Sequence, residues 1–441
     1  MRKADGDVSG DEQIPRGRLR RLGKIVGMST RVGAGLVSSG ARRLRGEEGD
    51  PRLDAARKVL DTLGELKGAA LKVGQTMALI SDQLPPEARA IISQLFSQAP
   101  TLPFEEIARV IEQELGRPPG ELFAELEPTP FAGASLGQVH RARLFSGEEV
   151  AVKVQYPGVD SALEADLRNV QSVLRAVGLG SQLLDTREYF DEMRREITAE
   201  LDYRRELQNL EEFRGYLGRW PDLVVPRAYP QLCTGKVLVL ERLEGPTLHE
   251  YARSIERVPP PVRFAVAERL SRAILGPFVY HRVIHGDAHP GNFVVMEGDR
   301  LGVLDYGSAK HLSKRFWSAY LEGFGAALEG RQVYLPTLLR GAGFVLDLPE
   351  ERAAQLLDAV AQIVGAPLAG PYDWSRDTMV QQMMGLRARY ALDFLRIRVP
   401  PEALLFYRAI AGLGHDLRSL KAAGDFRPFL RTALAASRRK A

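Results

Sequence analysis

The sequence lacks the features that mark secreted, disulfide-bonded and membrane-spanning proteins. Its single cysteine, Cys233, excludes a disulfide framework or a thiolate metal site within one chain. No apolar run approaches the roughly 20 residues that span a bilayer, and the N-terminus shows no secretory signal peptide. The 60 basic and 56 acidic residues nearly cancel, so the overall charge does not indicate nucleic-acid binding. We therefore expect a cytoplasmic protein in a reducing compartment that binds no nucleic acid.

One region is locally basic. Residues 14–45 carry nine Lys or Arg residues and no acid, interleaved with apolar side chains. Such a pattern is typical of a segment that lies on an anionic surface at the inner face of a membrane. It is equally typical of a basic, Gly- and Ser-rich leader that is partly disordered. The sequence leaves both interpretations open.

The 441 residues divide by pattern into a leader and three larger regions. Residues 1–50 are the polar, basic leader, and residues 51–128 show helical periodicity, including an amphipathic helix over 103–115. Residues 129–245 combine alternating strands, with a hairpin turn at Ser146-Gly147, with helices expected near 160–177 and 186–217 and a strand over 236–242. Residues 246–441 are mainly helical, apart from a short strand pair around 293–305. This order predicts an α+β protein with two lobes.

The residues that indicate chemistry lie in the last of these regions. In His-Gly-Asp-Ala-His-Pro-Gly-Asn, Asn292 follows Asp287 by five residues, the interval between the catalytic Asp and the metal-binding Asn of a kinase loop. Asp305-Tyr306-Gly307 begins thirteen residues later and matches the D-F-G turn, whose Asp holds magnesium. Asn292 and Asp305 are hard oxygen ligands that, with phosphate oxygens, suit Mg²⁺. Asp287 is the candidate to accept a proton or orient water.

A lysine at the right place upstream completes this set. Val150-Ala151-Val152-Lys153 resembles the V-A-I-K strand of kinases, with Lys153 on the strand face opposite the valines. A phosphate-binding lysine on a strand needs a carboxylate to orient it, and Glu206 is the candidate. Each motif is weak alone, but their order, type and spacing together predict nucleotide-phosphate chemistry.

Two further motifs distinguish this chain from other small-molecule kinases with a similar loop. Residues 71–75 resemble the K-x-G-Q signature, and residues 131–140 the alanine-rich nucleotide loop, of the UbiB/ADCK/AarF family of atypical protein-kinase-like proteins. Residues 152–158 and 200–206 also match, so the resemblance covers roughly residues 53–310. The nucleotide-binding residues expected from this resemblance and from the hinge after the 236–242 strand are Ala132, Gly133, Ala134, Ser135, Leu136, Gly137, Gln138, Val139, Lys153, Leu240, Glu241 and Leu243.

The resemblance also implies a two-lobed protein-kinase-like fold, in which a helical N-terminal extension covers the active site and obstructs protein substrates. The occluding and regulatory residues would be Lys72, Gln75, Glu200 and Asp202. On a continuous helix Asp202 and Glu206 share a face, whereas Glu200 lies on another, so a distorted turn is expected at Glu200.

The function that the resemblance implies is that of an atypical kinase or ATPase, not of an ordinary protein kinase. Its cofactors would be ATP or ADP with Mg²⁺, which Mn²⁺ can replace. It would support isoprenoid-quinone biosynthesis or related membrane-lipid metabolism, with a lipid or quinone precursor as ligand. A small-molecule phosphotransferase of the aminoglycoside or choline kinase type, and a non-catalytic scaffold gated by nucleotide, remain as alternatives.

Three positions depart from the family pattern. Gly133 stands where alanine is usual, and glycine's freedom at positive φ would let the loop approach the phosphates, which leaves the preference for ATP or ADP open. Tyr306 replaces Phe and Ala288 replaces a common Pro. Neither replacement removes a ligand or a charge.

Overall fold

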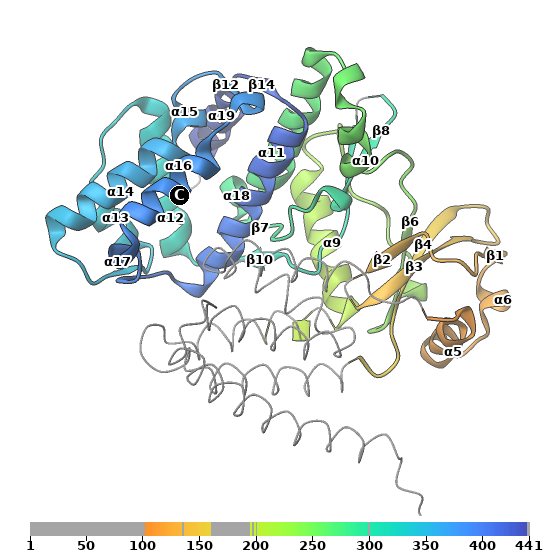
Figure 1. The fold of residues 1–441 in the computed structure, drawn as a ribbon. Helices are drawn as coiled ribbons and strands as arrows, with labels where there is room; N and C mark the ends of the chain where they lie inside the picture. The colour runs from red at the N-terminus through yellow and green to blue at the C-terminus, as the bar shows by residue number, and fades with distance from the viewer. Residues whose placement is uncertain are drawn as a thin grey trace, which may run out of the picture.

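The computed structural model describes residues 102–134, 136–159, 195, 198–199, 201–298 and 300–438. They form two lobes of unequal size, a small lobe built on an antiparallel sheet and a larger helical lobe (Figure 1). Each lobe has its own cluster of buried apolar side chains. The α+β protein-kinase-like architecture expected from the sequence is confirmed.

The small lobe is organised by a five-stranded sheet in the order β1-β3-β4-β6, with β2 paired to β3. Val150, Val152 and Val154 alternate along β4 and are fully buried, as expected for a strand with one face on a core. The predicted hairpin turn between β3 and β4 is confirmed, with Gly147 at φ 98°. The strands are β1 Glu125–Leu126, β2 Ala132–Ala134, β3 Gly137–Arg143, β4 Glu149–Gln155 and β6 Val237–Glu241.

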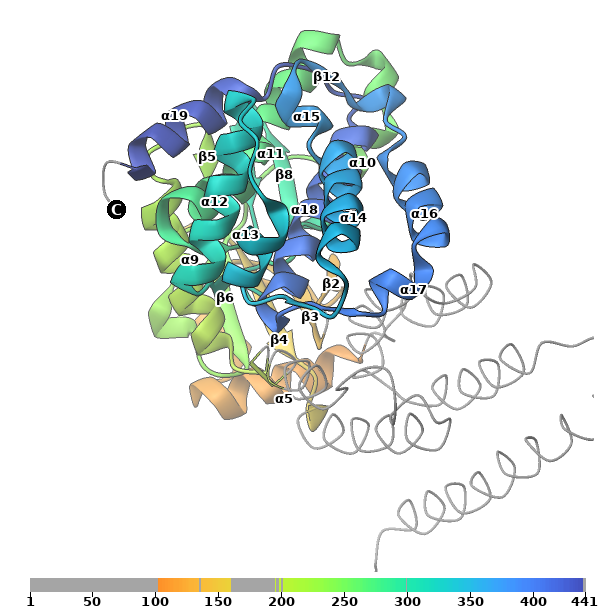
Figure 2. The ribbon, with the colours of Figure 1, turned by 90° about the vertical axis from the view of Figure 1, so that its left-hand side faces the viewer.

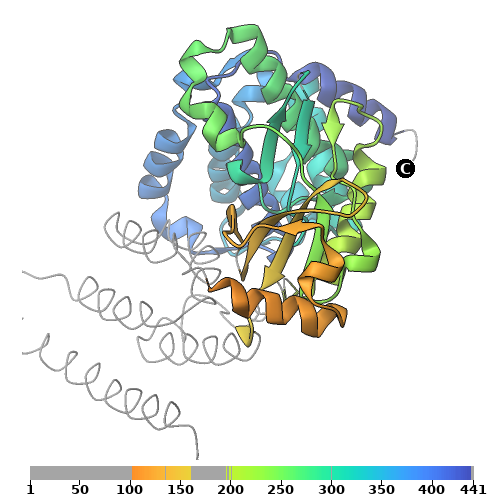
Figure 3. The same cartoon turned by 90° about the vertical axis from the view of Figure 1, so that its right-hand side faces the viewer.

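Helix α5 (Phe104–Leu115) packs against this sheet (Figure 3). Its buried residues Ile107, Val110 and Ile111 have helical spacing and join the small-lobe core, and Gly116 ends the helix in the left-handed conformation. The short helix α6 (Pro119–Leu122) and β1 follow at the same sheet. The residues from 104 to 126, which the sequence pattern grouped with the helical extension, therefore belong structurally to the small lobe.

Helix α9 (Tyr203–Leu217) connects the two lobes. Tyr203 and Glu206 at its start face the small lobe, while Leu210, Phe213 and Leu217 join the large-lobe core. The prediction of one helix through residues 186–217 is wrong at Asp202, which lies outside the helix and caps it by accepting from the Arg204 amide at 3.0 Å. Asp202 and Glu206 therefore do not share a helix face.

The large lobe is built around helix α11, which packs against α9, α18 and α19 (Figure 1). Helices α12, α13 and α14 cover one side of it (Figure 2). Its helices are α10 Leu248–Arg253, α11 Pro260–His281, α12 Lys314–Glu329, α13 Leu335–Gly341, α14 Glu350–Val364, α15 Ala366–Ala369, α16 Met379–Arg389, α17 Ala391–Phe394, α18 Pro401–Ser419 and α19 Arg427–Arg438.

Short strands in the large lobe position the loops that carry the site. The predicted strand pair forms as β8 and β9, which are antiparallel, and β5 pairs with β9 in parallel. Strand β7, which precedes this pair in the chain, is antiparallel to β10, which follows it. The strands are β5 Leu223–Val224, β7 Val283–Ile284, β8 Phe293–Met296, β9 Arg300–Val303, β10 Lys310–His311, β11 Val345–Leu346, β12 Tyr372–Asp373, β13 Ile397–Arg398 and β14 Ala423–Gly424. Single 3-10 turns lie at η2 Pro230–Leu232, η3 Ile255–Arg257, η4 Pro290–Asn292 and η5 Trp374–Arg376.

Within the described ranges, no helix combines the length and the apolar character needed to cross a bilayer.

Candidate active site

Lys153 lies at the centre of the site, between two carboxylates. Its Nζ donates to Glu206 Oε1 at 2.9 Å and Oε2 at 2.8 Å, and to Asp305 Oδ2 at 3.4 Å. Burial alone would lower the pKa of Lys153, but the Asp305 and Glu206 carboxylates hold it well above its usual range. Lys153 is therefore a permanent cation at neutral pH. Strand β4 supplies the lysine and helix α9 the glutamate, so the structure brings together residues that lie far apart in the sequence.

Asp305 lies in a tightly held turn. Its φ of 57° is in the left-handed region, and its Oδ1 accepts from the Gly307 amide at 3.1 Å. Tyr306, which is fully buried, donates its hydroxyl to Val303 O at 2.8 Å, and its own carbonyl accepts from Asn209 Nδ2 at 2.8 Å. The phenol that replaces the usual Phe thus adds a hydrogen bond, and Asn209 is a supporting residue that the sequence did not indicate.

The loop that carries Asp287 contains a glycine that no other residue can replace without displacing backbone. Gly286 has φ 76°, and a Cβ there would lie 2.1 Å from Ser308 O. The next residue, Asp287, accepts from Asn292 Nδ2 at 3.1 Å through Oδ2. The Leu304 amide donates to Asn292 O at 2.8 Å, which places Asn292 beside the turn that carries Asp305. The loop and the turn thus present Asp287, Asn292 and Asp305 at one place.

Both histidines of the loop have structural partners. His285 is 1% exposed, its Nε2 bonds to Leu304 O at 3.1 Å, and burial lowers its pKa. Because a carbonyl only accepts, Nε2 carries the proton of a neutral ring. His289 Nδ1 accepts from the Gly291 amide at 3.1 Å and caps the short turn before Asn292. Neither ring is needed as a base.

An arginine from far along the chain completes the loop. Arg408, on helix α18, places Nη2 2.7 Å from Asp287 Oδ1, and the two side chains are 15% and 26% exposed. Nothing in the sequence indicates Arg408, because α18 carries no recognisable motif and its approach to the loop depends on how the large lobe packs.

The predicted nucleotide loop is only partly available to a ligand. Ala132, Gly133 and Ala134 form β2, paired to β3, and Gly137 in β3 needs to be small because a Cβ would lie 2.1 Å from Val154 O. Leu136 and Gln138 are 2% and 0% exposed, and Gln138 bonds to the Leu102 backbone and His140. Their side chains belong to the lobe interior and are not available to a nucleotide. Val139 is half-buried in the same strand.

Gly133 does not behave as its departure from the family pattern suggested. It is absent from the glycines with positive φ among the described residues, and a Cβ there would meet nothing within 4 Å. The expectation that its positive φ lets the loop approach phosphates is therefore wrong, because β2 holds it in an ordinary strand conformation.

The predicted adenine hinge lies at the end of β6. Leu240 is half-buried and bridges to Ala228. The amides of Glu241 and Arg242 donate to Arg227 O at 2.7 Å and Glu149 O at 3.1 Å. These two amides are occupied, so a hinge at this place would have to use other backbone groups, such as those of Leu243.

Asn292 and Asp305 fit a magnesium ion by the chemistry of their donors. An amide oxygen and a carboxylate supply two hard ligands, which is what Mg²⁺ needs when phosphate oxygens and water complete its octahedron. Among the described residues no group of three or more His, Cys, Asp or Glu side chains forms a metal cage of its own. The site thus suits a metal that arrives with a nucleotide.

Four predicted residues, Lys72, Gln75, Ser135 and Glu200, lie outside the described residues.

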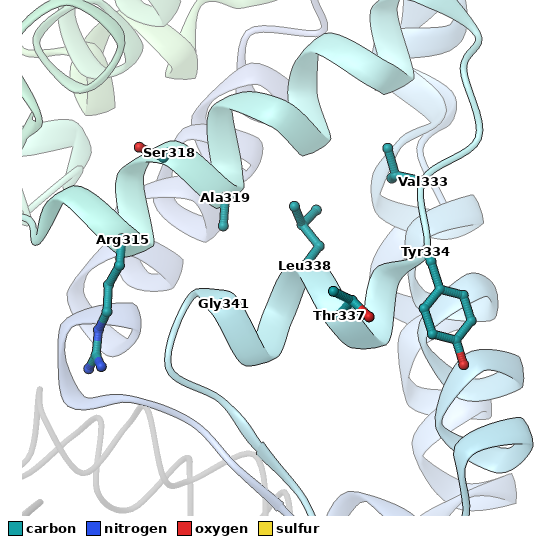
Figure 4. A pocket seen from close by; sticks show the side chains of 8 residues that line it. All are labelled: Arg315, Ser318, Ala319, Val333, Tyr334, Thr337, Leu338 and Gly341. Atoms are coloured by element: carbon teal, nitrogen blue, oxygen red, sulfur yellow. The ribbon is translucent and has the colours of Figure 1, made fainter. Parts of the chain in front are cut away.

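A hollow of about 530 Å³ lies away from the candidate site, between α12 and α13 (Figure 4). Its lining is mostly apolar and includes Arg315, Tyr334 and Leu338, but none of the candidate site residues. We therefore do not assign the chemistry to this hollow.

Comparisons with known proteins agree with this arrangement. Residues 94–333 match the family described as the ABC1 atypical kinase-like domain. The chain is 28% identical over 420 residues to the atypical kinase COQ8B, mitochondrial, of Rattus norvegicus, covering 92% of this chain and 78% of the rat protein. It is 33% identical over 287 residues to AarF domain-containing protein kinase 1 of Xenopus laevis, covering 64% of this chain and 54% of the frog protein.

A solved structure is similar over nearly its whole length. The complex of Rv3197 with erythromycin from Mycobacterium tuberculosis matches with a TM-score of 0.58 and 27% identity, over 91% of this chain and 97% of that one. The family match covers more than half of the chain and includes Lys153, Glu206, Asp287, Asn292 and Asp305. The chain therefore belongs to the UbiB/ADCK/AarF family of atypical kinases, which carries the ABC1 kinase-like domain.

Proposed function

We propose that the chain binds a magnesium nucleotide and acts as an atypical kinase or ATPase. The observation that supports this most is the position of Lys153, 2.8 Å from Glu206 and 3.4 Å from Asp305. Lysine oriented in this way is suited to the α- and β-phosphates of a nucleotide. Asn292 and Asp305 would hold Mg²⁺ or Mn²⁺, which would neutralise phosphate charge when bound.

The reaction assigned to this site is phosphoryl transfer. An oxygen of water or of an acceptor hydroxyl forms a bond to the γ-phosphorus, and the bond from phosphorus to the β,γ-bridging oxygen breaks. The bonding electron pair leaves with ADP, and Asp287 orients the attacking oxygen and accepts its proton. Because the groups around the phosphates are fixed in advance, they stabilise developing charge without reorganising. Adenine would be read by backbone groups at Leu243.

The substrate class rests on the family resemblance. We propose that turnover supports isoprenoid-quinone biosynthesis or related membrane-lipid metabolism, with a lipid or quinone precursor as ligand, rather than ordinary protein phosphorylation. Residues 14–45, with nine basic residues and no acid, are the proposed contact with an anionic membrane.

A second candidate is transfer to a small hydroxylated molecule. It is favoured by the relative whose structure was solved with erythromycin, since that match covers 91% of this chain. Phosphate transferred from labelled ATP to a macrolide, at a rate above that of transfer to water, would favour this candidate over an ATPase.

The deciding experiment is magnesium-dependent phosphate release by the wild type and Asp305→Asn, with and without anionic liposomes and phenolic quinone precursors. The proposal expects release by the wild type, stimulation by liposomes, and a loss of roughly two orders of magnitude in the variant. A wild type that binds nucleotide but releases no phosphate under all conditions would instead be a nucleotide-gated scaffold.

A further inference from the structure

The ion pair between Arg408 and Asp287 joins helix α18 to the loop that carries Asp287. Arg408 comes from α18, and Gly412, one turn further along this helix, lies directly against the catalytic loop. A Cβ at Gly412 would be 2.5 Å from Ala288 O, so the helix backbone touches the residue after Asp287. Residues four apart on a helix share a face. The helix therefore holds the Arg408 side chain at a fixed position relative to the loop.

Both oxygens of the Asp287 carboxylate have a side-chain partner. Oδ1 lies 2.7 Å from Arg408 Nη2, and Oδ2 accepts from Asn292 Nδ2 at 3.1 Å. The Asp287 carboxylate thus lies between the Arg408 guanidinium and Asn292, which would bind the metal. Lys153 is engaged elsewhere, with Glu206 and Asp305. Arg408 and Lys153 thus hold different carboxylates of the site, Asp287 on one hand and Glu206 with Asp305 on the other.

The loop itself has no permanent cation. The residues between Asp287 and Asn292 are Ala288, His289, Pro290 and Gly291. None of these is a lysine or arginine, and His289 Nδ1 accepts from the Gly291 amide. Transfer of a phosphoryl group spreads negative charge over its oxygens, and an arginine in cis is one means of stabilising that charge. Here α18 supplies a cation that the loop lacks.

We propose that Arg408 is a further residue of the phosphoryl-transfer site, which positions the Asp287 carboxylate and places a positive charge beside the terminal phosphate. This inference rests on the proposed nucleotide-binding function. A guanidinium has five donors in a planar fork, so one arm can hold Asp287 while another contacts a phosphate oxygen. A purely structural ion pair would not distinguish a nucleotide with a terminal phosphate from one without it.

The test compares binding of Mg-ADP and of a non-hydrolysable Mg-ATP analogue to the full-length chain by calorimetry. In Arg408→Ala, affinity for the ATP analogue should fall by about tenfold, while affinity for ADP should change less than about twofold. Arg408→Lys should recover part of the difference, because lysine keeps the charge but not the fork.

The matched control is Arg418→Ala on the same helix. Arg418 forms an ion pair with the buried Asp377 at 2.8 Å, and ten residues place it about 15 Å along α18 from Arg408. This variant should lower the melting temperature at least as much as Arg408→Ala, yet leave the ratio of the two affinities unchanged. Millimolar guanidinium should restore phosphate release to Arg408→Ala and not raise it in the control.

Three results would overturn the role of Arg408: an equal loss of affinity for both nucleotides, no loss for either, or faster phosphate release by Arg408→Ala. The failure of the proposed function is separable from these. If the wild type binds both nucleotides but releases no phosphate, the proposed ATPase activity is refuted. The comparison of affinities then still decides the role of Arg408. A wild type that binds neither nucleotide overturns both.

Discussion

Glu206→Gln tests the central ion pair of the site with little change in side-chain volume. The wild-type carboxylate accepts from Lys153 Nζ through both oxygens, at 2.9 and 2.8 Å. The glutamine removes the negative charge and replaces one acceptor by an NH₂ donor, which cannot bind an ammonium group. The Glu206 and Lys153 side chains are only 6% and 15% exposed, so water cannot fully replace the lost partner.

The expected loss follows from this geometry. Leaving one member of a buried ion pair uncompensated costs about 3–5 kcal/mol, and a hydrogen bond to a charged group contributes about 1.5–3 kcal/mol. Asp305 Oδ2, at 3.4 Å, still pairs with Lys153 in the variant. We therefore expect the lower end, a loss of about 3 kcal/mol in the free energy of unfolding at pH 7.5.

The sign of the pH dependence is also fixed. Burial opposes the charge on Lys153, but the two carboxylates more than offset it and raise its pKa in the folded state well above 10.5. A raised folded-state pKa gives stability that is fully present below about pH 10.5 and is lost as the pH rises through the higher folded value. The difference between wild type and variant should thus be constant from pH 7 to pH 9 and shrink above pH 10.5.

The assay is urea unfolding followed by circular dichroism, with Glu211→Gln as the control on the same helix. Glu211 is 47% exposed and its Oε1 lies 3.6 Å from Arg214, so its loss should cost less than about 0.5 kcal/mol. In Glu206→Gln, Lys153 should also move toward Asp305, and affinity for Mg-ADP should fall. If Glu206→Gln is no less stable than Glu211→Gln, the ion pair does not organise this site and the reasoning is refuted.

Three further predictions concern other parts of the chain. Gly137→Ala should destabilise the protein by at least about 2 kcal/mol in urea unfolding, because a Cβ would lie 2.1 Å from Val154 O. Gly133→Ala has open space around the new Cβ and should be neutral or slightly stabilising. Equal effects of the two substitutions would contradict the described strand pairing. Burial raises the pKa of Asp416 from 3.8 to about 8, so the unfolded chain releases this proton first and stability should fall as the pH rises from about 4 to about 8. This contribution amounts to at most about 1.4 kcal/mol per pH unit, and calorimetry should show that Asp416→Asn lacks it. If the stability of Asp416→Asn depends on pH as that of the wild type does, Asp416 is not a buried neutral carboxyl. Deleting residues 14–45 should weaken co-sedimentation with anionic liposomes most strongly at low salt, and unchanged binding would end the membrane proposal.

Much of the fold could be predicted because it is encoded locally. The alternation of Val150, Val152 and Val154 defines a strand with one buried face and puts Lys153 on the other. Gly147 supplies the turn conformation that the hairpin needs, and Gly116 ends α5 where the helical period stops. Each of these features depends on residues within a few positions of one another.

Two features differ from the prediction, one local and one set by long-range packing. The helix through residues 186–217 was predicted as continuous, but Asp202 takes an extended conformation and caps α9, since its carboxylate competes for the Arg204 amide. Gln138 was expected at the nucleotide, yet it is fully buried beside His140 because the sheet turns it inward. Burial at such positions depends on which elements pack against the strand, and a single sequence does not contain that information.

The sequence by itself determined which residues could perform phosphate chemistry, because the types and spacing of Asp287, Asn292 and Asp305 are those that a metal and a phosphate chain require. Only the tertiary structure decided how they are supported. It brings Glu206 to within 2.8 Å of Lys153 and Arg408 to within 2.7 Å of Asp287. Both pairs form because helices α9 and α18 pack across the site, and packing between distant segments is set by the whole core rather than by any local motif.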